Sequence, residues 1–114
     1  MQINNIRFKN LSEQEKGQFE KYLDSKLPRI EEYARKFDGD TIKFFVEAEK
    51  FATKSAYKVK FEFEAPKIYL VVSEDDHTIN EAVDLALDKL ITRMKKEMKS
   101  WKKNMDKEIR RQVK

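Results

Sequence analysis

The chain has 114 residues, enough for one domain with a single core, and its charged residues (40%) and hydrophobic residues (39%) are almost equal in number. It contains 8 Phe, 4 Tyr and 1 Trp, and this aromatic content argues against disorder. The absence of cysteine and the presence of one histidine exclude disulfides, thiolate sites and histidine metal clusters, and favour the cytoplasm. No stretch is apolar enough to span a bilayer and no secretory signal is evident, so we expect a cytoplasmic protein without membrane contact.

The first part of the chain predicts a strand followed by an interrupted helix. Residues 3–8 indicate the strand, and Ser12-Glu-Gln-Glu15 is a capping box that opens a helix with one apolar face. Pro28 cannot donate a hydrogen bond to the preceding turn, so we expect a break or kink there and a second helical piece to about Lys36. The turn residues Asp38-Gly39-Asp40 predict the end of the helix.

The middle of the chain predicts three further strands. Residues 41–49 and 57–65 alternate between apolar and polar side chains with a period of two, as half-buried strands do. Pro66 ends the second of these, and residues 68–73 predict the last strand. The acidic residues 74–76 are then expected in a turn, because they lack the ligand spacing and glycine of a calcium loop.

Charge pairing suggests a register for the first hairpin. If the connection is centred on Ala52-Thr53, Glu47 faces Lys58 and Lys43 faces Glu62 on the solvent side of the sheet. Opposite charges across the ladder favour this antiparallel pairing.

The last predicted helix begins at a second capping box, Thr78-Ile-Asn-Glu81, and extends to about Asn104. Its apolar residues fall on one side at 100° per residue. They are Ile79, Val83, Ala86, Leu87, Leu90, Met94, Met98, Trp101 and Met105. Such a helix is about 40 Å long, so its final turns should project beyond the sheet that it covers.

The element order is therefore β-α-β-β-β-α, which predicts an α+β fold with a four-stranded mixed sheet and two helices packed on one face. The first two strands should be parallel, because a crossover helix connects them. We expect one domain over residues 1–104 and a basic C-terminal tail over residues 105–114.

The charge of the chain is concentrated at its C-terminal end. Residues 89–114 hold eleven Lys and Arg against three Asp and Glu, whereas residues 1–88 hold fourteen against eighteen. The lysines are not matched by glutamates four residues away, so a polyanion would relieve their repulsion, although a solvated helix face would look similar. The candidate RNA-binding residues are Lys89, Arg93, Lys95, Lys96, Lys99, Lys102 and Lys103.

A motif at the start of the last helix resembles the ribosome hibernation-promoting factor family, which includes ribosome-associated inhibitor A. The family pattern is close to A-I-D-x-A-x-D-K-L followed by lysines, and the matching residues are Ala82, Val83, Asp84, Ala86, Asp88, Lys89 and Leu90. The resemblance implies the same four-stranded fold, bound to rRNA in the tRNA and mRNA channel of the small ribosomal subunit, where it inhibits translation. It also implies that Lys89, Arg93, Lys96, Lys99 and Lys103 meet rRNA phosphates.

The chain departs from the family pattern in two places. Arg7-Phe-Lys-Asn10 replaces the early histidine-containing segment, and Met98 stands where many members have a lysine. These differences affect the individual contacts. The chain length corresponds to the short form of the family, without the additional dimerising domain, and we expect a monomer.

Two other interpretations remain open. The protein could be an adaptor that binds another protein through its acidic body and projecting helix, or a generic double-stranded RNA-binding module. Under each of these interpretations, the sequence places no nucleophile beside a base, and its two glycines cannot form a phosphate-binding loop. We therefore expect no enzymatic activity, cofactor, metal or small-molecule substrate.

Two aromatic residues, Phe45 and Tyr69, are expected on the open face of the sheet near Lys43, Lys60 and Lys67. This arrangement resembles the aromatic platform on which sheet-based RNA readers stack unpaired bases. Such residues more often only cover the sheet.

Overall fold

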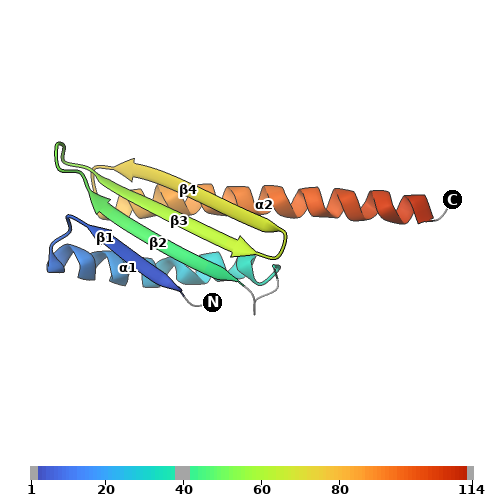
Figure 1. Ribbon diagram of the computed structural model, residues 1–114, viewed down its shortest axis with the longest axis horizontal. Coiled ribbons are helices and arrows are strands. Elements are labelled where there is room, and N and C mark those ends of the chain that lie inside the picture. The colour runs from blue at the N-terminus through green and yellow to red at the C-terminus, as the bar shows by residue number, and fades with distance from the viewer. Residues whose placement is uncertain (1–2, 38–41, 113–114) are drawn as a thin grey trace.

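The computed structural model describes residues 3–37 and 42–112, with side chains described as far as Lys99, and in this part the chain forms four strands and two helices (Figure 1). They are β1 (Asn5–Lys9), α1 (Glu13–Ala34), β2 (Lys43–Lys50), β3 (Tyr57–Ala65), β4 (Ile68–Asp76) and α2 (Ile79–Gln112). This is the predicted β-α-β-β-β-α order of an α+β fold.

One sheet contains the strands in the order β1-β2-β3-β4. β1 is parallel to β2, as the crossover through α1 predicts, and the other neighbours are antiparallel. Both helices lie behind the same face of the sheet (Figure 1). The mixed sheet with a single helical layer is therefore confirmed.

The register of the β2–β3 hairpin was predicted wrongly by two residues. Glu47 lies opposite Lys60 instead of Lys58, and Lys43 is shifted in the same way, opposite Glu64. A shift of two residues leaves every side chain on its predicted face, because the side-chain period of a strand is two. It also leaves opposite charges facing each other, so neither pattern could distinguish the two registers.

The hairpin loop accounts for the shift. The Phe51 N–H donates to the Ala56 carbonyl oxygen at 3.0 Å, and the Ala56 N–H donates to the Lys54 carbonyl oxygen at 2.9 Å. These bonds close the hairpin around a turn centred one residue later than predicted. Local backbone geometry, rather than side-chain pairing, therefore sets the register.

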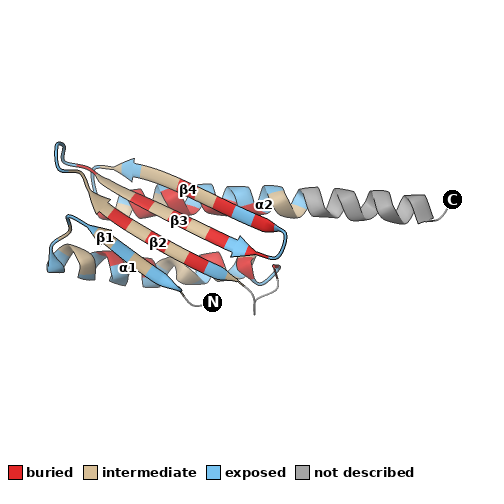
Figure 2. Cartoon of the chain, in the orientation of Figure 1, coloured by how far each residue is buried: buried red, intermediate tan, exposed pale blue. Residues whose placement is uncertain are grey.

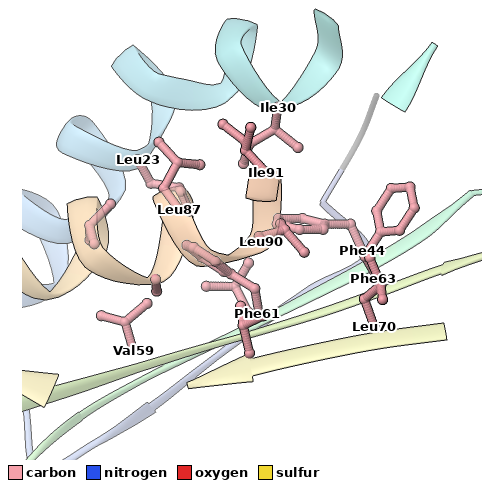
Figure 3. Packing of buried hydrophobic residues seen from close by; sticks show 14 of the residues in the cluster. Leu23, Ile30, Phe44, Val59, Phe61, Phe63, Leu70, Leu87, Leu90 and Ile91 are labelled. Atoms are coloured by element: carbon pink, nitrogen blue, oxygen red, sulfur yellow. The ribbon is translucent and has the colours of Figure 1, made fainter. Parts of the chain in front are cut away.

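The core lies between the sheet and the helical layer (Figure 2). Alternate residues of the central and β4 strands point into it, among them Phe44, Val46, Val59, Phe61, Phe63, Leu70 and Val72. Buried residues of the helices close it from the other side, including Phe19, Leu23, Ile30, Val83, Leu87, Leu90, Ile91 and Met94. Figure 3 shows part of this cluster, in which labelled side chains of the helices, such as Leu87 and Leu90, face labelled side chains of the strands, such as Val59 and Phe61.

The break predicted at Pro28 is absent, because α1 continues through this residue to Ala34. Pro28 is on the exposed side of the helix, where water can bind the carbonyl group that loses its usual partner. Ile30, two residues later, is fully buried and holds the following turn against the core. The turn predicted at residues 38–40 lies outside the described residues.

β4 is three residues longer than predicted. Glu74, Asp75 and Asp76, expected in a turn, instead extend the strand by pairing with the first three residues of β3. Basic side chains stabilise this extension, since Lys89 Nζ lies 3.1 Å from the Glu74 carboxylate and Lys54 Nζ lies 3.6 Å from that of Asp75. The cross-strand pairing and these ion pairs overcome the low strand propensity of acidic residues.

α2 begins where the second capping motif predicts. The Thr78 hydroxyl accepts a hydrogen bond from the Glu81 N–H at 3.1 Å. The helix then continues to Gln112 and extends well beyond the sheet (Figure 1). The molecule is accordingly long and narrow, with extents of 62 × 26 × 18 Å.

Glu15 connects the start of α1 to the sheet. The predicted capping box is present, since the Glu15 N–H donates to Ser12 Oγ at 3.1 Å and the Ser12 N–H donates to Glu15 Oε1 at 3.0 Å. The Tyr57 hydroxyl donates to Glu15 Oε2 at 2.5 Å, and Lys50 Nζ lies 3.7 Å from the same oxygen. The Tyr57 hydroxyl above all, followed by the Ser12 N–H, lowers the pKa of Glu15 to about 2.

Replacing this carboxylate by Glu15→Gln is expected to destabilise the fold most at neutral pH. Because the pKa in the folded state lies below the ordinary value of 4.5, the charge stabilises fully above that pH and less as the pH falls towards 2. Urea unfolding across this interval should show the difference between variant and wild type shrinking. Glu13→Gln, which changes a 91% exposed side chain in the same turn, is the control and should shift stability by less than about 0.5 kcal/mol. A Glu15→Gln difference that is independent of pH would contradict the assignment.

Candidate nucleic-acid interface

α2 has one buried and one exposed face over its described side chains. Its buried residues recur at three- and four-residue spacings and pack on β3, β4 and α1. After Asp88, every exposed charged side chain in the described part of the helix is a cation, and Glu97, the acidic residue there, is half-buried. These cations, called the basic face below, are Lys89, Arg93, Lys95, Lys96 and Lys99.

Two members of the basic face contact the edge of the sheet. Lys89 forms the ion pair with Glu74 described above, and the Arg93 guanidinium donates to the Val71 carbonyl oxygen at 2.8 Å. Val71 belongs to β4, an edge strand, so Arg93 covers a backbone acceptor that no neighbouring strand uses. Arg93 has further donors on its guanidinium that can still meet an anion.

A third member of the basic face lies towards α1. Lys95 Nζ is 5.2 Å from the centre of the Tyr33 ring, and Lys36 Nζ is 5.9 Å from the same ring. Both ammonium groups are within the range of a cation–π interaction. The exposed Lys95 and Lys36 therefore extend positive charge from α2 across to the end of α1.

The remaining two described members, Lys96 and Lys99, are exposed and have no ion-pair or hydrogen-bond partner among the residues whose side chains are described. The ammonium donors of each are therefore available to an external ligand. Lys102 and Lys103, the other predicted site residues, lie on the helical backbone of α2, but their side chains are outside the described part. The structure thus brings five of the seven predicted residues onto one helix face.

The structural role of Asp84 and Asp88, at the edge of the α2 apolar stripe, was not predicted from the sequence. The Tyr22 hydroxyl of α1 contacts both carboxylate oxygens of Asp84 at 2.8 Å, and Arg29 of α1 donates to Asp88 at 2.9 Å. Lys26 Nζ also lies 3.9 Å from Asp84. These contacts, called the interhelical clamp below, fix α1 against α2 and use carboxylates that would otherwise weaken the positive potential nearby.

The spacing of the clamp residues could have indicated this contact. Asp84 and Asp88 are four residues apart, as are Tyr22 and Lys26, so each pair lies along one side of its helix. The sequence alone did not reveal which side of α1 would face α2. The hydrogen bond to Asp84 raises the pKa of Tyr22, so this hydroxyl remains a donor well above neutral pH.

The open face of the sheet has a different electrostatic character. Its outward-pointing cations and anions are equal in number and alternate across the strands. The cations are Arg7, Lys9, Lys43, Lys58 and Lys60, and the anions are Glu47, Glu49, Glu62, Glu64 and Asp75. The open face therefore has no net positive charge to attract a polyanion.

Neither a metal site nor a membrane-spanning helix is found in the described part of the chain. No group of three or more His, Asp or Glu side chains there is arranged to hold a metal ion. Over the same residues, neither helix has an apolar stretch that could pass through a bilayer. His77, the histidine of the chain, lies in the bend before α2, with Nδ1 3.5 Å from the Ser55 carbonyl oxygen.

Comparison with known families agrees with the fold and the motif. The family model described as "Sigma 54 modulation protein / S30EA ribosomal protein" matches residues 5–102, which include every element from β1 through most of α2. The chain belongs to this family of ribosome-associated modulation and hibernation factors, whose members are not enzymes. No curated protein is similar enough in sequence to count as a match.

Two solved structures share the fold. The N-terminal domain of Protein Y from Thermus thermophilus is 23% identical, with a TM-score of 0.66 over 84% of this chain and 98% of that domain. A ribosomal subunit interface protein from Coxiella burnetii is 17% identical, with a TM-score of 0.52 over 82% of this chain and 97% of the other. At these identities the likeness establishes the common architecture.

The interhelical clamp can be tested by Tyr22→Phe, which removes the hydroxyl bound to Asp84. We expect a loss of about 1 kcal/mol in the free energy of unfolding, the usual net contribution of such a bond. Urea denaturation measures it. Tyr33→Phe on the same helix is a matched control, because no hydrogen bond of the Tyr33 hydroxyl is found among the described residues, and it should change stability by less than about 0.5 kcal/mol. Equal losses in the two variants would argue against the clamp.

Proposed function

We propose that this protein binds rRNA of the small ribosomal subunit through the basic face of α2 and inhibits translation. Family membership supports association with the ribosome. The observation that favours this particular surface is the set of exposed cations on α2. Lys96 and Lys99 among them have no partner in the described part of the chain. The nearby carboxylates Asp84 and Asp88 are already engaged in the interhelical clamp.

The chemistry of the basic face suits phosphates rather than bases. Ammonium groups bind phosphate oxygens as point charges, and each phosphate that they neutralise releases condensed counterions. Binding should therefore be strongly salt-dependent and nearly independent of sequence. Lys102 and Lys103 follow on the same helix, and we assign them to this surface as well.

The shape of the molecule supports a steric mode of inhibition. The sheet and α1 pack together beside the first part of α2, which extends far beyond them (Figure 1). A monomer held by α2 in the tRNA and mRNA channel would exclude those ligands without any chemical step. In this proposal residues 1–104 form the ribosome-binding domain, residues 105–114 add a basic tail, and the protein acts in the cytoplasm with the ribosomes.

The test is charge reversal at the two cations that have no described partner. Lys96→Glu combined with Lys99→Glu should leave the fold intact, because both side chains are exposed, and should abolish cosedimentation with small subunits at low salt. Where residual binding can be measured, the slope of log affinity against log salt should fall by about one for each phosphate that the variant no longer neutralises.

The control carries the same charge change at a distance from the basic face. Lys21→Glu with Lys43→Glu alters two exposed lysines, on α1 and on the open face of the sheet, that form no ion pair among the described residues, and this variant should still cosediment. Unchanged binding of the Lys96/Lys99 variant would refute this surface. If free double-stranded RNA competes with ribosomes for the wild-type protein as effectively as added ribosomal RNA does, the protein is a general duplex binder instead.

A further inference from the structure

The open face of the sheet contains a shallow hollow on the side opposite the helices. Its volume is about 270 Å³, and it extends across β1, β2 and β3. This is below the range of about 300–1,000 Å³ that is common for ligand pockets, so it fits one small ring system. The side chains that line it include Asn5, Arg7, Phe45, Glu47, Lys60 and Glu62.

An aromatic ring forms the apolar part of this hollow. Phe45 lies directly between Asn5 of β1 and Glu62 of β3 in the strand register, and it is half-buried among polar side chains. Tyr69 of β4 borders the hollow, since its hydroxyl donates to Glu62 Oε2 at 3.0 Å while 61% of the residue is exposed. The sequence-based placement of Phe45 and Tyr69 on the open face is thus confirmed.

The polar groups around Phe45 are mixed in kind. Arg7 and Lys60 are donors, Glu47 and Glu62 are acceptors, and Asn5 is both. Lys60 pairs with Glu62 at 3.2 Å, while Arg7 has no ion pair among the described residues. Equal numbers of positive and negative groups do not attract a polyphosphate, but they match a neutral ring with donors and acceptors on its edge.

We propose that this hollow binds one unpaired nucleobase of single-stranded RNA, stacked on Phe45 with its edge hydrogen-bonded by the surrounding polar side chains. Stacking on an aromatic residue and hydrogen bonding at the base edge are the two interactions by which proteins recognise unpaired RNA. Among the bases, adenine presents an amino group to the carboxylates and ring nitrogens to Arg7 and Lys60.

This site is separate from the basic face of α2 and uses different chemistry. The proposed helix site binds phosphates, so its affinity should fall steeply as the salt concentration rises. The hollow binds a base, which releases no counterions, so the affinity of this site should depend much less on the salt concentration. The proposal therefore does not rest on ribosome binding. Either surface can be present without the other, and each has its own assay.

Nuclear magnetic resonance of the full chain with hexaadenylate RNA provides the test. Amide signals of Arg7, Phe45 and Lys60 should shift on titration, and an abasic ribose-phosphate oligomer of the same length should not shift them. The Lys96→Glu, Lys99→Glu variant should retain these shifts. Shifts confined to α2, or equal shifts with the abasic oligomer, would overturn the proposal.

Variants at the stacking residue give the second measurement. Phe45→Ala should weaken hexaadenylate binding at the hollow about fivefold or more, which corresponds to the lower limit of about 1 kcal/mol for stacking one base. Phe45→Leu keeps an apolar side chain of similar size and should also weaken binding, so the test holds if the alanine variant is unstable. Phe51→Ala, at an aromatic residue of the neighbouring loop, is the control and should bind as wild type. Full affinity in Phe45→Leu would refute stacking.

Discussion

The arrangement of this protein depends on the burial of one apolar stripe of α2 against the sheet. Leu87, Leu90 and Met94 are completely buried, and this burial sets the rotation of the helix about its axis. Once that rotation is set, Lys96 and Lys99 must point to solvent, because they are on the other side of the helix. The same packing that stabilises the core therefore presents the cations.

Three acidic side chains on or near α2 are engaged in structural contacts. Asp84 and Asp88 bind α1, and Glu74 binds Lys89 at the edge of the sheet. The residues that hold the helices together are thus largely distinct from Lys96 and Lys99, to which we assign phosphate binding. Stability and binding can consequently be altered separately by mutation, and a positive surface persists although the body of the chain is acidic.

The two faces of the molecule differ in the ligands they suit. The exposed charged side chains of the basic face are all positive, as long-range attraction of a polyanion requires. The open face of the sheet is balanced in charge, so attraction there depends on short-range contact with Phe45 and its polar neighbours. The two proposals together assign a phosphate backbone and an unpaired base to separate places on one protein.

The sequence by itself determined the element order, the inward face of each strand and the exposure of Lys96 and Lys99. These follow from periodicities of 2 and 3.6 residues, which are local properties of the chain. Only the tertiary structure decided the β2–β3 register, the continuity of α1 through Pro28 and the partners of Lys89, Arg93 and Lys95. The register depends on loop geometry and the others on contacts with distant elements, and a pattern along the chain does not encode which distant residues will meet.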